Sequence, residues 1–138
     1  QAVEVRGREM AGEAVRLAGL RDKLWDGIRA RVDEVRLNGH PTLRLPGTCN
    51  MCFRNVESES IVLGLDLKGI ATSAGSACTA GSVEPSYVLV AMGLPLDWAM
   101  GSVRCSLGRS TTAEDIDYVI ESVVPLAAKL RALSPVKA

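Results

Sequence analysis

The sequence has few of the residues on which nucleic-acid binding and membrane insertion usually depend. Its 16 basic and 16 acidic side chains cancel, so it lacks the excess of positive charge typical of nucleic-acid-binding domains. Aromatic residues make up only 4% of the chain, which leaves little for base stacking. A membrane span needs roughly 20 consecutive apolar residues, and the longest uncharged stretch, 69–83, is interrupted by Gly, Ser and Thr. We therefore expect a protein that binds neither nucleic acid nor membrane.

Histidine is almost absent too. The one histidine, His40, lies between Gly39 and Pro41 in a predicted turn, so a mechanism that needs a histidine base would have to take it from elsewhere. The chain begins at Gln1 instead of Met and has a helical pattern from its first residues, which favours a fragment of a longer protein. No secretory signal opens the sequence. We therefore expect a cytoplasmic location and four free cysteine thiols.

The pattern of apolar residues predicts an α/β (α+β) fold. Apolar side chains at three- and four-residue steps, from Leu17 to Val35, predict one long helix over residues 1–35. Alternation, turn residues and capping patterns then predict strands at 35–37, 48–53, 70–72 and 102–107, helices at 58–67 and 86–92, and a last helix opened by a capping box at Thr111-Thr112-Ala113-Glu114. This order fits a single domain, residues 1–138, with a small, largely antiparallel sheet covered by helices.

Cys49 and Cys52 have the CxxC spacing that occurs in zinc and redox sites. A tetrahedral zinc site needs four ligands, and no second CxxC or histidine pair follows. Residues three apart on a strand also point to opposite faces, so we interpret the pair as small apolar residues of a strand and expect no resident metal. Cys105 lies with Val103 and Leu107 on the apolar side of its strand, which predicts a buried structural thiol.

Cys78 is the cysteine that packing does not explain. It lies in residues 73–82, and all the remaining residues of this segment are Gly, Ala, Ser or Thr. This composition predicts a loop. An incidental loop cysteine is the plain alternative, although an exposed thiol is open to oxidation. We expect Cys78 to be a sulfur nucleophile, which requires a nearby cation or a helix N-terminus to favour its thiolate.

Two arginines are candidates for binding an anionic group. Arg104 alternates with Val103 and Cys105, so it should face away from the apolar side of its strand. From there its guanidinium could bind a carboxylate through two parallel hydrogen bonds. Arg109 follows in a predicted turn, and for both arginines the local sequence leaves plain surface exposure as the alternative.

Two stretches of the chain match motifs of a known family. The first is Thr72-Ser73-Ala74-Gly75-Ser76-Ala77-Cys78, followed by Gly81-Ser82-Val83-Glu84-Pro85-Ser86-Tyr87-Val88-Leu89 and Ala91-Met92-Gly93. The second is Ser102-Val103-Arg104-Cys105-Ser106-Leu107-Gly108-Arg109-Ser110-Thr111-Thr112, with Leu37-Asn38-Gly39 and Leu45-Pro46-Gly47-Thr48-Cys49-Asn50 in the expected order upstream. Together they resemble cysteine desulfurases of the NifS/IscS type, which are class V aminotransferases. The resemblance covers nearly the whole chain.

The resemblance implies the small domain of a fold-type I enzyme that uses pyridoxal 5′-phosphate to remove sulfur from L-cysteine, leaving L-alanine. Cys78 matches the family's nucleophile, which carries the sulfur as a persulfide, and Arg104 matches the arginine that binds the substrate carboxylate. The implied partners are a second copy in a homodimer and an iron–sulfur scaffold or other sulfur acceptor, with Cys78 as a transient ligand of an iron–sulfur cluster. Where relatives commonly have Phe, this chain has Cys105.

One feature of the family is missing from the chain. The family's cofactor lysine follows a Ser-x-His motif on a large domain, and no lysine here follows a histidine; the lysines are Lys23, Lys68, Lys129 and Lys137. The resemblance therefore implies the C-terminal small domain alone, joined through the helix at 1–35 to a missing large domain and inactive by itself. Two alternatives remain: a scaffold-docking module without chemistry, and a metal- or cluster-binding module that uses Cys49, Cys52, Cys78 and Cys105.

Overall fold

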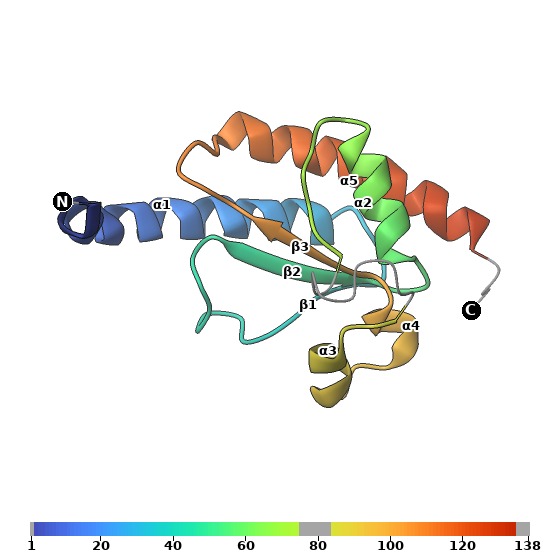
Figure 1. Cartoon of the computed structure of the whole chain (residues 1–138). Coiled ribbons are helices and arrows are strands. Elements are labelled where there is room, and N and C mark those ends of the chain that lie inside the picture. Colours follow the sequence, from blue (N-terminus) through green and yellow to red (C-terminus); the bar gives the residue numbers. More distant parts are fainter. Residues whose placement is uncertain (1, 75–83, 135–138) are drawn as a thin grey trace.

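The chain folds into a three-stranded sheet with helices on both faces (Figure 1). The structure is a computed structural model that describes residues 2–74 and 84–134, with side chains from residue 10 onward. Its elements are α1 (Ala2–Arg29), β1 (Val35–Leu37), β2 (Thr48–Phe53), α2 (Ser58–Asp66), α3 (Tyr87–Ala91), α4 (Leu96–Ala99), β3 (Ser102–Ser106) and α5 (Ala113–Leu133). None of the helices in these ranges is long and apolar enough to cross a membrane.

The sheet is antiparallel, with β2 between β1 and β3. Its register sets Met51 of β2 beside Leu37 of β1 and Val103 of β3. Side chains alternate between the two faces along a strand, so Cys49 and Phe53 share the face of Met51. All three residues are at most 1% exposed, because this face is covered by helices.

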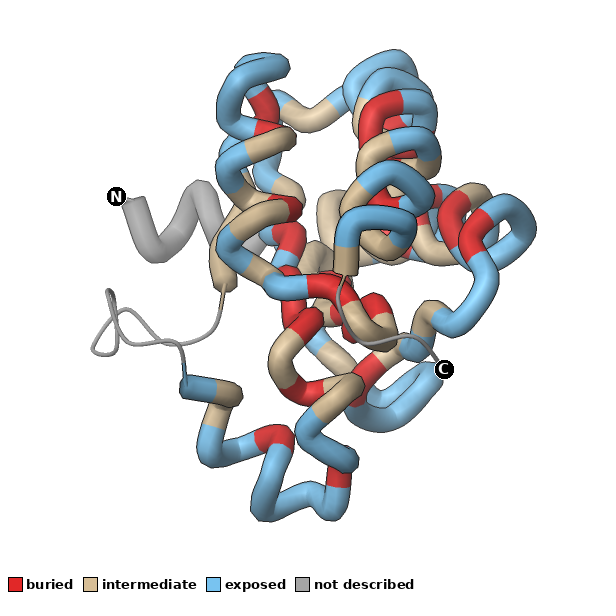
Figure 2. Tube along the Cα trace, turned by 90° about the vertical axis from the view of Figure 1, so that its right-hand side faces the viewer, coloured by how far each residue is buried: buried red, intermediate tan, exposed pale blue. Residues whose placement is uncertain are grey.

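Three helices form the layer over this apolar face. α1 and α5 lie side by side, and α2 packs against α5 and β3 (Figure 1). Buried side chains line their inner surfaces: Leu24 and Ile28 of α1, Ile61 and Leu65 of α2, and Ile116, Ile120 and Val123 of α5. Figure 2 shows buried segments concentrated in the interior and exposed segments on the outer turns. Full burial of such a side chain contributes about 1.5–3 kcal/mol, so this layer is the main source of stability.

The other face of the sheet is polar and only partly covered. α3 and α4 lie on that side of the sheet (Figure 1), where Cys52 of β2 packs with Leu89, Leu94 and Ala99. Alternation directs further side chains to the same face, namely Arg36, Asn50, Ser102, Arg104 and Ser106. Among the described residues, one face of the sheet therefore builds the core, and the opposite face carries these polar side chains.

The predicted architecture and most predicted elements are confirmed. The strands expected at 35–37 and 48–53 have those bounds, and the strand expected at 102–107 ends one residue earlier. The long first helix ends at Arg29, not at residue 35. Its end is followed by Glu34 with a φ of 49°, a left-handed conformation that turns the chain into β1.

The prediction of a strand at 70–72 is wrong. The backbone N–H of Ile70 donates to the carbonyl of Leu65 at 3.0 Å, so it serves the end of α2. In this segment only Ser73, which follows residue 72, pairs with β3, in an isolated bridge. A short apolar run is thus used here to close a helix, because the turn at Gly69 directs Ile70 into the core.

The predicted capping box is shifted by one residue. Thr112 is the N-cap of α5, and its side chain and that of Asp115 bond each other's backbone N–H groups. The hydroxyl of Thr111 accepts instead from the N–H of Gly108 at 3.0 Å, which closes the preceding turn. The short helix α4 is not foreseen from the sequence, because four residues are too few for a periodic pattern.

Gly101, between α4 and β3, occupies a position where a side chain does not fit. A Cβ there would lie 1.9 Å from the carbonyl oxygen of Phe53 and 2.8 Å from that of Val56. We expect Gly101→Ala to lower the free energy of unfolding by about 3 kcal/mol, because two backbone segments would have to move apart. Gly19→Ala in α1, where a Cβ would meet nothing within 4 Å, should raise it by about 0.5–1 kcal/mol. Urea denaturation followed by circular dichroism measures both, and equal effects would contradict the expectation.

Candidate functional site

Arg104 lies in the middle of β3 and faces the polar side of the sheet. Its neighbours Val103 and Cys105 are 1% and 8% exposed, whereas Arg104 itself is exposed. The predicted orientation of Arg104 is therefore confirmed. Among the described side chains and backbone groups, none hydrogen-bonds its guanidinium, so five N–H donors are available for an anionic ligand.

The segment that leads toward Cys78 pairs with β3 at Arg104. The backbone N–H of Ser73 donates to the carbonyl of Arg104 at 3.1 Å, and the N–H of Arg104 donates to the carbonyl of Ser73 at 2.8 Å. This antiparallel bridge adds one residue to the open edge of the sheet. Cys78 lies outside the described residues, and its assignment as nucleophile stays a prediction.

A cluster of hydrogen-bonded side chains lies next to Arg104 on the polar face. We call it the polar cluster; it consists of Asn38, Asn50, Cys52 and Ser102. Asn38 Nδ2 donates to Asn50 Oδ1 at 2.5 Å and to Cys52 Sγ at 2.9 Å. Asn50 Nδ2 donates to Ser102 Oγ at 3.3 Å. Since Asn50 is the register partner of Arg104, the polar cluster and Arg104 are neighbours on this face.

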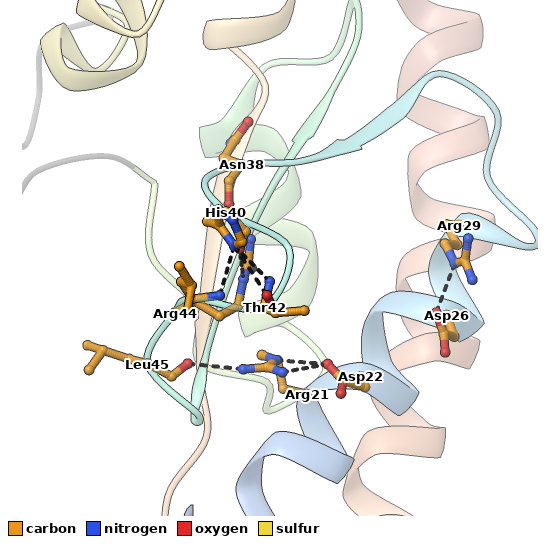
Figure 3. A network of polar contacts seen from close by, with 10 residues as sticks. Arg21, Asp22, Asp26, Arg29, Asn38, His40, Thr42, Arg44 and Leu45 are labelled. Atoms are coloured by element: carbon orange, nitrogen blue, oxygen red, sulfur yellow. Dashed lines mark hydrogen bonds and ion pairs between the residues drawn. The ribbon is translucent and has the colours of Figure 1, made fainter.

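The turn that follows β1 holds Asn38 in place (Figure 3). The guanidinium of Arg44 donates to the carbonyls of Asn38 and His40, both at 2.7 Å. His40 Nδ1 accepts from the backbone N–H groups of Thr42 at 3.2 Å and Leu43 at 2.9 Å. His40 is therefore a turn residue, as predicted, and its ring stabilises the turn.

A second contact in Figure 3 joins this turn to α1. Arg21, which is 7% exposed, donates to Asp22 Oδ1 at 2.9 and 2.7 Å. Its guanidinium also donates to the carbonyl of Leu45 at 3.3 Å. Arg21 thus uses its donors within the fold, unlike Arg104.

Two of the cysteines face each other in the core. Cys49 and Cys105 are register partners on the helix-covered face of β2 and β3. Burial raises the pKa of Cys49 to about 11 and that of Cys105 to about 12, so both thiols stay protonated at neutral pH. Burial also raises the pKa of Cys52, although hydrogen bonds with Asn38 and Ser102 oppose the rise. The interpretation of these three cysteines as buried thiols is confirmed.

The described cysteines cannot share one metal ion. Cys52 points to the polar face, whereas Cys49 and Cys105 point into the core on the other side of the sheet. Among residues 2–74 and 84–134, no group of three or more Cys, His, Asp or Glu side chains is arranged to hold a metal. A module that binds one metal through all four cysteines is therefore inconsistent with the sheet.

The described lysines do not fit a pyridoxal phosphate site beside Arg104. Lys23 pairs with Asp117 of α5 at 2.8 Å, Lys68 follows α2, and Lys129 lies in α5. These positions belong to the helical layer, which covers the opposite face of the sheet. The described part of the chain therefore provides no amine for the cofactor next to Arg104.

The sequence alone did not single out Asn50 or Ser73. Asn50 lies between Cys49 and Met51, in a strand interpreted chiefly through its cysteines, and Ser73 begins a predicted loop. Alternation along 48–53 does direct Asn50 to the face opposite Cys49 and Met51. Which residue of another strand lies beside it depends on register, and no local pattern specifies the register.

Because Cys105 is buried, the free energy of unfolding should fall as the pH becomes alkaline. In the unfolded chain the thiol titrates near its ordinary pKa of 9.0, whereas in the fold its pKa is raised to about 12. The unfolded state therefore loses its proton first as the pH rises, so this stabilisation is complete below pH 9 and is lost as the pH rises from 9 to about 12. We expect Cys105→Ala to reduce the fall in unfolding free energy above pH 9, measured by urea denaturation. Parallel pH profiles of the two proteins would contradict this.

Comparison with known proteins identifies the family of the chain. The sequence profile of the aminotransferase class-V family matches residues 9–119. Cysteine desulfurase IscS from Shewanella sp. (strain ANA-3) is 47% identical over 135 residues, an alignment that covers 98% of this chain and 33% of that protein. The chain thus spans about a third of the length of the curated relatives that it matches.

Solved structures of NifS-like proteins have a similar fold. A NifS-like protein from Rickettsia africae superimposes with a TM-score of 0.77 at 24% identity, over 90% of this chain and 31% of the other. Another solved structure, described as a NifS-like protein, gives a TM-score of 0.79 at 26% identity, over 94% and 32% of the two chains. With a family profile that matches most of its length, the chain belongs to the aminotransferase class-V family.

Proposed function

We propose that this chain is the C-terminal small domain of a cysteine desulfurase, with Cys78 as the residue that accepts sulfur and Arg104 as the residue that binds the substrate carboxylate. The observation that carries the proposal is the 47% identity to cysteine desulfurase IscS over 98% of the chain. The reaction converts L-cysteine and the Cys78 thiol into L-alanine and a Cys78 persulfide. The C–S bond of the substrate and the S–H bond of Cys78 are broken, while the S–S bond of the persulfide and a C–H bond of the alanine methyl group are formed. The sulfur is oxidised as the carbon is reduced, so no external oxidant is needed.

The surroundings of Arg104 support its role. A guanidinium binds a carboxylate through two parallel N–H···O bonds, and this geometry requires an arginine whose donors are not already used. Among the described residues Arg104 meets that requirement, whereas Arg21 is bonded to Asp22 and Leu45. A residue in the middle of a strand is also held more rigidly than one in a turn, which favours precise binding.

The bridge at Ser73 supports a shared role for Cys78 and Arg104. Ser73 is hydrogen-bonded to Arg104 through both backbone groups. Four residues separate Ser73 from Cys78 in the sequence, so chain length limits the distance between their Cα atoms to at most about 18 Å. A thiol on such a tether can reach a substrate whose carboxylate is bound at Arg104.

The cofactor belongs to the rest of the proposed enzyme. Pyridoxal 5′-phosphate, when bound there, would hold the amino group of the substrate and act as an electron sink. The described lysines do not fit that site, so this chain contributes the residues that bind the carboxylate and receive the sulfur. By itself it should not turn over cysteine.

The proposal includes partners for the full-length enzyme. A persulfide is useful only if an acceptor takes its terminal sulfur, so we include an iron–sulfur scaffold or another sulfur-acceptor protein, with Cys78 as a transient cluster ligand. The family resemblance also implies a homodimer, which we include. We place the enzyme in the cytoplasm, because a sulfur-accepting thiol must return to its reduced state in each cycle. A scaffold-docking module without chemistry is the second candidate, and the free donors of Arg104 argue for chemistry instead.

Replacement of the nucleophile tests the proposal directly. In the full-length enzyme that carries this chain, Cys78→Ser should reduce alanine formation from L-cysteine to the background level, because serine cannot form a persulfide. The matched Cys49→Ser variant removes a buried thiol and should keep its activity wherever it remains folded. Alanine formation by Cys78→Ser at the parent rate would rule out Cys78 as the sulfur acceptor.

Replacement of the arginine tests the second assignment. Arg104→Ala should raise the KM for L-cysteine by roughly a hundredfold, because a charge-assisted bidentate contact is lost, and should lower kcat much less. Arg36→Ala is the control, since Arg36 is an exposed arginine on the same face of the sheet, in β1. An unchanged KM in Arg104→Ala, or an equal rise in both variants, would show that Arg104 does not bind the carboxylate.

A further inference from the structure

We propose that Asn50 is a second carboxylate-binding residue, which donates a side-chain N–H to the same substrate carboxylate that Arg104 binds. The inference rests on the proposed function and assigns a further substrate contact within it. Three observations support it: the position of Asn50 relative to Arg104, the orientation of its amide group, and a side-chain N–H that has no acceptor among the described residues.

Asn50 and Arg104 are close neighbours on the polar face. In an antiparallel pair, hydrogen-bonded and non-hydrogen-bonded residue pairs alternate. Leu107 donates to the carbonyl of Gly47 at 2.7 Å, and Phe53 donates to that of Gly101 at 3.0 Å. Steps of two from either pair make Cys49 and Met51 members of hydrogen-bonded pairs. Asn50 lies between them, so Asn50 and Arg104 form a non-hydrogen-bonded pair, in which the Cα atoms lie only about 4.5 Å apart. Their side chains therefore leave the sheet next to each other.

The polar cluster orients the amide of Asn50. Asn38 Nδ2 donates to Asn50 Oδ1 at 2.5 Å, and Ser102 Oγ donates to the same oxygen at 3.4 Å. The carbonyl oxygen of the amide is therefore directed toward Asn38, and Nδ2 points away from it. Asn38 is itself held by its backbone N–H, which donates to the carbonyl of Asn50 at 2.9 Å, and by Arg44, which donates to its carbonyl (Figure 3). The orientation thus follows from contacts outside the substrate site.

One N–H of Asn50 has no acceptor in the described part of the chain. A side-chain amide carries two N–H groups, and Asn50 Nδ2 donates only to Ser102 Oγ, at 3.3 Å. Asn50 is half-buried, so its amide can reach a ligand on the open part of the polar face. A carboxylate has about four acceptor positions, of which a guanidinium fork uses two. An amide N–H beside the fork fits one of the others.

The chemistry of the pair suits the carboxylate of an α-amino acid. Arg104 supplies the charge, and the neutral amide adds a directional donor without repelling the guanidinium. A purely structural role for Asn50 is the alternative, because Asn50 also joins Asn38 to Ser102. Asn50→Asp separates the two roles, since the new carboxylate still accepts from Asn38 while it replaces the free donor with a negatively charged oxygen.

The experiment uses the full-length enzyme loaded with its cofactor. Isothermal titration calorimetry measures the equilibrium binding of L-alanine, the product, and of ethylamine, which is L-alanine without its carboxylate. Asn50→Ala should weaken L-alanine binding roughly tenfold and Asn50→Asp by on the order of a hundredfold, with ethylamine binding unchanged. The KM for L-cysteine should rise in parallel. Arg36→Ala is the control, because it removes an exposed side chain from the same face of the sheet and leaves the hydrogen bonds of Asn50 in place.

Two results would overturn the inference. One is L-alanine binding in Asn50→Asp equal to that of the parent enzyme. The other is a loss that is equal for L-alanine and ethylamine, since that would indicate a general disturbance of the site. The failure of the proposed function looks different: Cys78→Ser and Arg104→Ala would then leave activity unchanged. If those two variants are impaired and Asn50→Asp binds L-alanine normally, only the role of Asn50 is excluded.

Discussion

The pairing of β2 with β3 is the interaction on which both the core and the candidate site depend. Its register sets Cys49 against Cys105 on one face and Asn50 against Arg104 on the other. A slip of one residue would turn Arg104 into the helical layer and expose Cys105, because adjacent residues of a strand point to opposite faces. Burial of the apolar face therefore also specifies the arrangement of the polar one.

The helical layer makes that arrangement rigid. α1, α2 and α5 cover the apolar face over β2 and β3, so β3 is held by contacts on the side opposite Arg104. On the polar face, α3 and α4 cover only the end near Cys52 and leave Arg104 exposed. The proposed carboxylate-binding residue is thus held on a rigid strand, beside the bridge to Ser73. Rigid support of this kind fixes the backbone of Arg104, and with it the part of the polar face that the guanidinium can reach.

Local patterns predicted much of this from the sequence. Alternation along 102–106 correctly directed Arg104 outward and Cys105 inward, because a strand's two faces follow from its period of two. The same reasoning placed Cys49 and Cys52 on opposite faces. The errors lie where two local solutions compete: Thr111 and Thr112 can each cap a helix, and the contact of Thr111 with Gly108 decides between them. At Ile70, a bond to Leu65 replaced an expected strand.

By itself, the sequence determined the α/β architecture, the outward direction of Arg104 and the motifs around Cys78 and Arg104 that mark the family. Only the tertiary structure decided that Asn50 lies beside Arg104, that Ser73 bonds to it, and that Asn38 orients the amide of Asn50. The reason is physical. Facing direction follows from the backbone geometry of a single strand, whereas register is set by the packing of segments that are far apart in the chain.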